Sequence, residues 1–326
     1  MAVADASGSD SSLLAVQVAR LFFERQLTKT EIAKRLGISR FRVARVIDQA
    51  LAEGLVTIQF RDPLPLQAAL GRAIEERFGL DLCLVLRGKR TGLAQPPMDL
   101  VRLAAVTVDD LLGPDEVVGV AWGATVTAVV DAVRPRGPSG LRVVQLAGGS
   151  VRAEAAHNPS EVARRLAERL GAAYHPLYAP TVLESAPLRA ALVREPDVRA
   201  MVELFDAVSF ALVGIGAFGA RPGKGDGSAL VRSGVLAPAE VARLREAGAV
   251  GDLVMHPFAA DGRLVPSELQ ERTIAVSIEQ LRRVPRVMAV AGGTAKARAI
   301  AGALATGAIK MLVTDEAAAH AIAFRR

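Results

Sequence analysis

Short apolar runs alternate with helical stretches over most of this chain, and the alternation constrains its fold more than any other feature. The runs have the length of buried strands, whereas the stretches between them have the spacing of amphipathic helices. Apolar strands that alternate with helices predict an α/β fold whose parallel sheet is covered on both faces. The runs lie at 80–86, 116–122, 141–149, 207–216, 286–293 and 309–315. The helical stretches lie at 66–79, 99–112, 124–134, 159–170, 238–247, 267–281 and 294–305.

Glycines stand where several of these runs stop, in the segments 121–125, 146–150, 214–219 and 291–296. In open α/β sheets, ligands bind at the carboxyl ends of the strands. Glycine lets the backbone approach a ligand, so we expect the glycines at the strand ends to expose their N–H groups, and the helix that follows offers further free N–H groups to an anion. Lys296 lies in the first turn after the last segment, where a cation is unfavourable unless it has an anionic partner. Each segment alone is more typical of a tight turn, but four of them in one sheet indicate a pocket for a phosphate or carboxylate.

The composition excludes several classes of site. The chain has 326 residues, a formal net charge of +6 and one cysteine, Cys83, so it forms no internal disulfide and no cysteine-based metal cluster. A single cysteine fits a reducing cytoplasm. The four histidines are scattered without metal-ligand spacing, and we expect neither a metal nor a cofactor. No uncharged stretch reaches the length of a membrane helix, and the first residues lack the pattern of a signal peptide, so we expect no membrane partner.

The segment after a tail at 1–11, which we expect to be disordered, predicts three short helices. Apolar residues fit a first helix at 12–26. Thr28 can cap a second helix, with Glu31 completing a capping box, and Gly37 can end it in a tight turn. Ser39 can cap a third helix that extends to about residue 53. This is the helix-turn-helix arrangement.

The third helix has two distinct faces. Val43, Ile47, Ala50 and Leu51 share an apolar face, as a core stripe requires. Arg42, Arg45 and Gln49 share another, with Arg40 on the first turn. Residues 28–46 contain six basic side chains and one acidic, a local charge of +5. Such a helix can enter the major groove and present arginines to guanine edges and phosphates, so the segment predicts binding to double-stranded DNA.

The residues after the third helix predict the domain organisation. Residues 55–62 alternate like a short β wing, and two prolines within 61–67 indicate a stiff linker. We therefore expect a winged helix-turn-helix domain at 12–61 and a second, α/β domain at 62–326. The predicted DNA-binding residues are Thr28, Lys29, Ser39, Arg40, Phe41, Arg42, Arg45 and Gln49.

The chain also resembles a known family. Residues 28–58 are similar to the DNA-binding segment of SorC-type sugar-responsive transcriptional regulators, which include the deoxyribonucleoside regulators. The likeness continues in order through 118–126, 144–149, 178–182, 212–219, 248–253 and 258–262, and is most specific at 289–322. The resemblance implies a Rossmann-like effector domain similar to sugar-phosphate isomerases and glucosamine-phosphate deaminase. It also implies a homodimer or homotetramer and a sugar or sugar-phosphate effector.

The resemblance assigns effector-binding roles to nine residues. It implies a phosphate-cradling loop at Gly123, Ala124 and Thr125, and a second loop at Gly148, Gly149 and Ser150 with Asn158 facing the same pocket. It makes Asp252 the acceptor for sugar hydroxyls and Lys296 the basic residue after the last glycine loop. The chain departs from the family at Ala147, Ala259 and Phe41, where relatives often have Asn or Arg, Asp, and Pro respectively.

Two functions follow from these observations. The first is a DNA-binding regulator whose α/β domain binds a sugar or sugar phosphate that alters operator affinity. The alternative is a sugar-phosphate isomerase or deaminase type of enzyme with an attached DNA-binding module. An enzyme needs a positioned general base. His157, His175 and His256 flank expected loops, but no arrangement of catalytic residues accompanies them. The sequence favours the regulator and predicts no catalytic residue.

Overall fold

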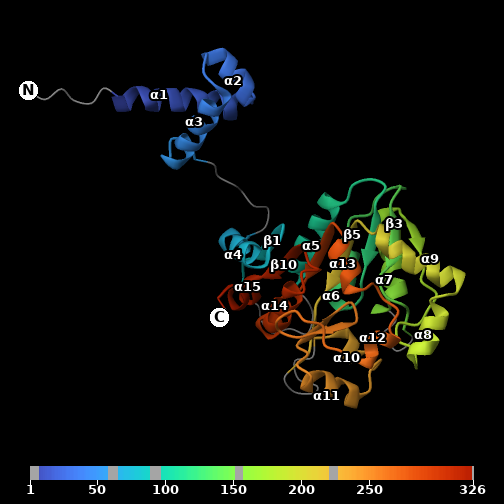
Figure 1. The fold of residues 1–326 in the computed structure, drawn as a ribbon. Coiled ribbons are helices and arrows are strands. Elements are labelled where there is room, and N and C mark those ends of the chain that lie inside the picture. The colour runs from blue at the N-terminus through green and yellow to red at the C-terminus, as the bar shows by residue number, and fades with distance from the viewer. Residues whose placement is uncertain (1–6, 58–64, 89–96, 151–156, 220–226, 325–326) are drawn as a thin grey trace, which may run out of the picture. The chain divides into compact units, whose positions relative to one another are not determined.

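The chain forms two compact units, Met1–Pro63 and Leu64–Arg326, which we call the smaller and the larger unit. They are drawn in the computed structural model of Figure 1. The structure describes residues 7–57, 65–88, 97–150, 157–219 and 227–324.

The smaller unit is helical. It contains α1 (Ser7–Ala19), a π-helical turn η1 (Arg20–Glu24), α2 (Lys29–Leu36) and α3 (Arg40–Ala52). Val18, Ile32, Val43 and Ile47 form its buried centre. α1 begins at Ser7, inside the segment that we expected to be a disordered tail, because a helix anchored by packed apolar residues gains a hydrogen bond for each residue added.

Two further expectations for the smaller unit were the burial of Leu51 and a β wing after α3. Leu51 was expected in the core, but its side chain is 38% exposed. It lies about 80° around the helix from Val43, at the edge of the buried stripe. The expected β wing lies mostly outside the described residues, and its described part, 55–57, is not a strand.

The larger unit is built on a seven-stranded sheet in the order β1-β10-β9-β5-β2-β3-β4, and every neighbouring pair is parallel. The α/β fold and the parallel sheet predicted from the alternation are confirmed. The strands are β1 (Leu82–Leu86), β2 (Val117–Val120), β3 (Arg142–Gln145), β4 (Ala173–His175), β5 (Phe210–Gly214), β9 (Arg286–Val290) and β10 (Met311–Asp315).

Helices cover both faces of this sheet (Figure 1). Alternate residues of one strand enter different apolar cores: Phe210 and Leu212 pack against α5, α6 and α7, whereas Ala211 and Val213 pack on the opposite side with α13 and α14. The helices are α4 (Ala68–Phe78), α5 (Met98–Leu111), α6 (Ala124–Ala132), α7 (Pro159–Leu170), α8 (Ala186–Leu192), α9 (Pro196–Leu204), α10 (Ala229–Arg232), α11 (Pro238–Glu246), α12 (Glu268–Arg272), α13 (Ile278–Arg283), α14 (Ala297–Ala305) and α15 (Glu316–Ala323), with short 3₁₀ turns η3 (Phe205–Ala207) and η4 (Thr294–Lys296).

The strand order creates a topological switch point. From β2 the chain proceeds outward through β3 to β4, and then returns to β5 on the other side of β2 and proceeds through β9 to β10. In open α/β sheets the crevice outside the carboxyl ends of the strands, at such a reversal, is where ligands bind. The segment 121–125 follows β2 at this point.

A second, three-stranded antiparallel sheet was not predicted. It consists of β6 (Gly216–Ala217), β7 (Gly251–Leu253) and β8 (His256–Phe258). β7 and β8 are joined by Val254 and Met255, both of which have positive φ, at 44° and 73°. Asn and Gly are the residues that usually favour such a two-residue turn. Because Val and Met do not, the sequence did not signal the hairpin.

The helix expected at 267–281 is interrupted. Its two parts, α12 and α13, are separated by an extended segment in which Thr273 pairs with Val182 and Ala275 with Ala147. Thr273, Ile274 and Val276 are β-branched and therefore suited to extended structure. The segment closes over the loops that follow β3 and β4.

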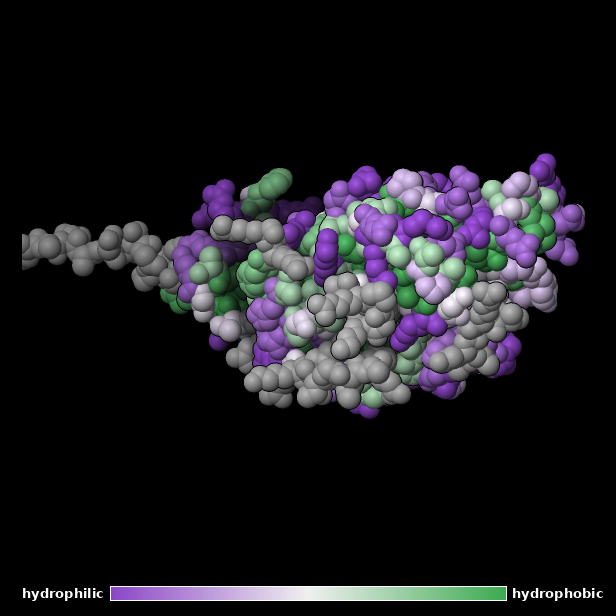
Figure 2. Space-filling view, turned by 90° about the horizontal axis from the view of Figure 1, so that it is seen from below, coloured by the Kyte–Doolittle hydropathy of each residue, from purple (hydrophilic) through white to green (hydrophobic). Residues whose placement is uncertain are grey.

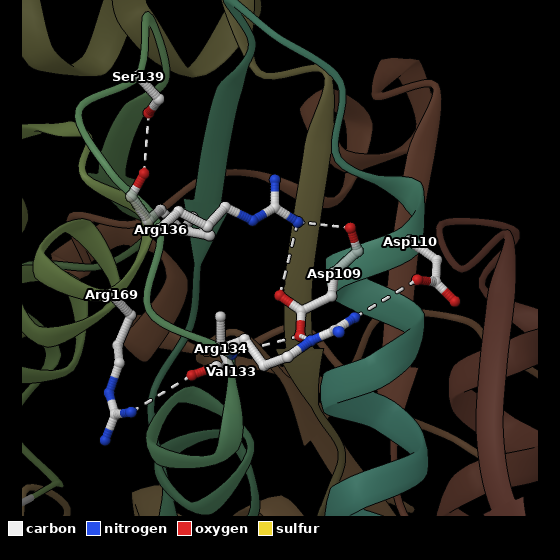
Figure 3. A network of polar contacts seen from close by, with 8 residues as sticks. Asp109, Asp110, Val133, Arg134, Arg136, Ser139 and Arg169 are labelled. Atoms are coloured by element: carbon white, nitrogen blue, oxygen red, sulfur yellow. Dashed lines mark hydrogen bonds and ion pairs between the residues drawn. The ribbon is translucent and has the colours of Figure 1, made fainter.

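Polar contacts tie α5, the loop before β3 and the end of α7 together (Figure 3). Nε of Arg134 donates to the buried carboxylate of Asp109 at 3.1 Å, and Arg136 contacts the carbonyl of the same residue. Arg169 donates to the carbonyl of Val133 at 3.4 Å. These contacts close the end of the sheet at which β3 begins, opposite to the glycine loops.

Hydrophilic and hydrophobic side chains are mixed on the surface shown in Figure 2. Figure 2 shows one face of the molecule, where hydrophilic residues surround smaller groups of hydrophobic ones. Exposed apolar residues are common on folded proteins, so single ones need no special explanation.

Candidate functional site

The predicted caps of the smaller unit are confirmed. The Thr28 hydroxyl accepts a hydrogen bond from the amide of Glu31, and the Glu31 carboxylate accepts one from the amide of Thr28 at 2.7 Å. Gly37 ends α2 with φ of 65°, and Ser39 accepts from the amide of Arg42 at 3.1 Å. The turn between α2 and α3 is therefore fixed at both ends by local hydrogen bonds.

Five of the residues predicted to bind DNA are exposed side chains of α3. Arg40, Phe41, Arg42, Arg45 and Gln49 of α3 are all exposed, and we call them the α3 face. Within it, Gln49 donates to the Glu53 carboxylate at 2.7 Å. Exposed arginines near the start of a helix-turn-helix recognition helix can reach base edges and phosphates.

The other three predicted residues lie at the starts of α2 and α3. Thr28 and Ser39 are exposed, but their hydroxyls serve as helix caps. Lys29 is half-buried, and its Nζ lies 6.0 Å from the centre of the Phe22 ring. These three side chains have structural partners of their own.

The loop after β2, residues 121–125, has the form that was predicted. Gly123 has φ of 111°, a conformation that favours glycine, and α6 begins directly after it at Ala124. Ala124 and Thr125 are half-buried in the first turn of α6. The loop therefore presents the start of a helix at the switch point of the sheet.

The loop after β3, residues 146–150, differs from its prediction. Its glycines were expected to offer free amides to an anion, but the amide of Gly148 donates to the Ile274 carbonyl at 2.9 Å and that of Gly149 to the Ala179 carbonyl at 2.8 Å. The reason is that the extended segment 273–277 and residues 178–182 pack directly against the loop. Gly148 is required for this packing, because a Cβ there would lie 2.5 Å from the Ala179 carbonyl oxygen.

Asn158 serves as the N-cap of α7. Its side-chain oxygen accepts from the amide of Ser160 at 3.1 Å, and its side-chain nitrogen donates to the Ser150 carbonyl at 2.8 Å. The residue thus joins the loop after β3 to α7.

Gly149, Ser150 and Asn158 line a cleft of about 1230 Å³ between α7 and the segment 176–184. Tyr178 on its rim is 79% exposed. Gly123, Thr125, Asp252 and Lys296 are not among the described residues that line this cleft.

Asp252 lies in a second group of residues. Its buried carboxylate accepts a hydrogen bond from the Ser228 hydroxyl at 2.5 Å and another from the amide of Met255 in the positive-φ hairpin. Burial raises the pKa of Asp252, against the lowering effect of these hydrogen bonds and of the nearby Lys296 charge. Gly216 makes room for this carboxylate, because a Cβ there would lie 2.0 Å from Oδ1.

Lys296 belongs to the same group. Its ammonium donates to the Ile215 carbonyl at 3.1 Å, and its side chain passes Gly227, where a Cβ would lie 2.6 Å from Cε. We call Ser228, Asp252 and Lys296 the Asp252 cluster. The charge of Lys296 lowers the pKa of Asp252, so the Asp252 carboxyl group is one neighbour that interacts with this ammonium within the same chain.

The loop after β2 lies next to the Asp252 cluster. A Cβ on Gly123 would lie 3.4 Å from that of Ala229, the residue after Ser228. The structure therefore divides eight of the nine predicted effector residues between the Asp252 cluster with its neighbouring loop and the cleft beside α7. The ninth, Gly148, lies in the loop after β3 but is not among the described residues that line the cleft.

The histidines near these residues have structural partners. Nε2 of His256 donates to the Val276 carbonyl at 2.9 Å, and burial lowers the pKa of His256, so the ring is neutral. Nδ1 of His157 lies 3.0 Å from the Thr127 hydroxyl. Over the described ranges there is no group of three or more His, Cys, Asp or Glu side chains that could hold a metal ion.

Ser228, Gly216 and Gly227 were not predicted as site residues. Ser228 precedes no apolar strand, and only its tertiary contact with β7 brings it to Asp252. Glycines at 214–219 were noted in the sequence, but the close approach of the Asp252 side chain to Gly216 is a tertiary contact.

None of the helices within the described residues has both the length and the apolar character needed to cross a membrane.

Comparison with known proteins identifies both parts of the chain. Residues 63–323 match the family described as "Putative sugar-binding domain". The chain is 30% identical over 325 residues to the erythritol catabolism regulatory protein EryD of Brucella abortus, covering 98% of each chain. It is 29% identical over 309 residues to the deoxyribonucleoside regulator of Bacillus subtilis, covering 95% of this chain and 96% of that protein.

A solved structure agrees over nearly the same length. The full-length sorbitol operon regulator SorC of Klebsiella pneumoniae aligns with a TM-score of 0.71 and 26% identity, covering 96% of this chain and 99% of that chain. The family match, these relatives and the fold confirm the resemblance seen in the sequence. The chain belongs to the SorC-type family of sugar-binding transcriptional regulators.

Proposed function

We propose that the protein binds operator DNA through the α3 face and that a sugar effector bound by the larger unit changes its operator affinity. The observation that carries this proposal is the exposure of Arg40, Arg42 and Arg45 on one capped helix within a local excess of positive charge. A ligand can change DNA affinity only by binding two conformations unequally. A protein that binds DNA in this way would act in the cytoplasm.

The first test removes the arginines of the α3 face. Arg42→Ala and Arg45→Ala should each weaken binding to a duplex selected from a random library by about 10- to 100-fold, the range for a base-reading arginine. The matched control is Arg20→Ala, because Arg20 is exposed in the smaller unit but lies outside α3 and pairs only weakly with Glu24 at 3.8 Å. Fluorescence anisotropy measures affinity. Parent-like binding by both α3 variants would show that another surface contacts the DNA.

For the effector we propose a phosphorylated or otherwise anionic sugar held by the loop after β2 and the Asp252 cluster. The first turn of α6 and the Lys296 ammonium supply positive potential, Thr125 supplies a hydroxyl, and Asp252 can accept from sugar hydroxyls. The loop after β3 contributes shape rather than amides, because its glycine N–H groups are already bonded. We propose that the wall of the effector site on this side is formed by Gly148, Gly149, Ser150 and Asn158.

A thermal-shift screen over sugars and their phosphates identifies the effector, and Lys296→Ala tests its binding site. This variant should bind the operator like the parent but lose the effector's influence on it. Lys310→Ala is the control, since Lys310 is a half-buried lysine of the same unit that bonds only its local Gly307 carbonyl, at 3.4 Å. An unchanged effector response in Lys296→Ala would remove the anionic-ligand argument.

We also propose a homodimer or homotetramer. A single helix-turn-helix makes few contacts, and regulators usually double them on half-sites related by symmetry. Sedimentation at micromolar concentration, with and without the duplex, measures the assembly. A monomer under both conditions would contradict the proposal.

An isomerase or deaminase activity is not proposed. The relatives are named as transcriptional regulators. Asp252 would be a poor general base, because its carboxylate is engaged by Ser228 and Met255 and is close to Lys296. Turnover of sugar phosphates by the purified protein, measured directly, would reverse this view.

A further inference from the structure

Phe41 is the most exposed of the large apolar side chains described in the structure. Its side chain is 86% exposed, compared with 38% for Leu51 near the other end of the same helix. The ring does not enter the buried centre formed by Val18, Ile32, Val43 and Ile47. An aromatic side chain therefore stands in water on a small domain whose core is complete without it.

The surroundings of Phe41 are cationic. Arg40 and Arg42 flank it in the sequence and Arg45 lies one turn along the helix, and all three are exposed. An uncharged apolar partner that covered this ring would have to strip water from three guanidinium groups without replacing their hydration. The ring and the charges must therefore be satisfied by one partner that offers both an apolar contact and anions.

A DNA major groove offers both. Phosphates form its rim, and the C5 methyl group of thymine is the apolar group on its floor, which Phe can contact. The first residues of a recognition helix are the ones that reach the base edges. Phe41 is the second residue of α3, so its position suits the floor of the groove rather than the rim.

We propose that Phe41 reads thymine through its C5 methyl group and so determines part of the operator sequence, an inference that rests on the proposed DNA-binding function. The arginines of the α3 face supply phosphate and guanine contacts. The phenyl ring adds a contact that guanine, cytosine and adenine cannot make, because they lack the methyl group.

The experiment replaces individual thymines by deoxyuridine, which removes only the methyl group. The probe is a duplex selected from a random library by the full-length protein. At one or two thymines per half-site, the replacement should weaken binding of the parent about fourfold, the effect of losing one buried methyl group. Phe41→Ala should bind both duplexes equally. Phe41→Leu, which keeps an apolar side chain, should retain part of the difference.

Leu51→Ala is the matched control, because Leu51 is the other large apolar residue of α3 that is exposed, and it lies in the last turn. It should keep the full effect of deoxyuridine. If Phe41→Ala keeps that effect as well, or if no thymine in the duplex responds in the parent, the assignment is wrong. A parent that selects no duplex would instead contradict the DNA-binding proposal itself, so the two failures are distinguishable.

Discussion

The α3 face and the loop after β3 differ in whether their polar groups are available to a ligand. On α3 the arginines are exposed and the backbone amides are occupied by the helix and its Ser39 cap. In the loop after β3 the amides of Gly148 and Gly149 looked available from the sequence, but they donate to carbonyls of Ile274 and Ala179, more than 25 residues away. A side chain on the outside of a helix is available by virtue of local periodicity, whereas the availability of a loop amide depends on which distant segment packs against it.

The Asp252 cluster differs from both regions. Its carboxylate is buried and its ammonium is half-buried, and each has partners within the chain: Ser228 and Met255 for the carboxylate, and the Ile215 carbonyl for the ammonium. A buried charge is tolerated only with such partners. A ligand bound here would therefore rearrange existing hydrogen bonds, whereas DNA would meet side chains that are already in water.

The largest loss of stability is expected from a substitution at the two glycines of the loop after β3. Gly148→Ala places a Cβ 2.5 Å from the Ala179 carbonyl oxygen, which is rigid backbone. Overpacking of this kind costs about 1–3 kcal/mol or more in unfolding free energy. Urea unfolding followed by the fluorescence of Trp122, the single tryptophan, measures the loss in the larger unit.

Gly149→Ala is its matched control. Its Cβ would lie 3.3 Å from the Ser160 hydroxyl, which is the end of a small side chain that can move. It should cost clearly less than Gly148→Ala. Equal stability of the two variants would mean that the loop is not held against residues 178–182 as described.

A smaller effect is expected in the smaller unit, at the cap that positions α2. Thr28→Ala removes the hydroxyl that accepts from the Glu31 amide and should lower the stability of this helix by about 1 kcal/mol. Thr30→Ala is the control, because Thr30 is an exposed threonine of α2 that is not its cap. Hydrogen exchange of the α2 amides measures both, and faster exchange in Thr30→Ala than in Thr28→Ala would count against the cap.

The same cap predicts a pH dependence. Two hydrogen bonds hold the pKa of Glu31 below its usual value: the larger effect comes from the Thr28 hydroxyl and the smaller from the Thr28 amide. A carboxyl group with a lowered folded pKa stabilises the fold above its unfolded pKa, and that contribution disappears as the pH falls through the folded pKa. Exchange of the α2 amides, corrected for the intrinsic pH dependence, should therefore become less protected in acid. In Thr28→Ala this acid sensitivity should be reduced.

The smallest effect concerns Cys83, which reports only on the larger unit because it is the sole cysteine. Burial raises the pKa of its thiol to about 12, with a smaller contribution from the charge of Glu75. The thiolate is the reactive form, so a disulfide reagent at neutral pH should leave the folded protein unmodified. Labelling should begin only when the larger unit opens in denaturant. Rapid labelling of the native protein would show that β1 is accessible.

Local sequence signals predicted some elements of this structure and not others. The caps at Thr28 and Ser39, the glycine at 37, and six of the seven strands of the parallel sheet followed from short-range signals, because caps and buried strands leave patterns within a few residues. β4 was missed because it has three residues. The interruption of the helix at 267–281 was missed although Thr273, Ile274 and Val276 gave a local hint. The hairpin at Val254 and Met255 gave none.

The sequence by itself determined that this chain has a helix-turn-helix and an α/β unit and, with the exception of Leu51, which of the predicted side chains of α3 face the solvent. Those properties depend on periodicity and on contacts between near neighbours. Only the tertiary structure decided that Asp252, Ser228 and Lys296 form one cluster, and that the amides of Gly148 and Gly149 are bonded internally. Both depend on contacts between segments distant in the chain, namely Ser228 with β7 and the segment 273–277 with the loop after β3. No local pattern encodes those contacts, because their energy comes from burial and hydrogen bonding between segments that meet only in the folded state.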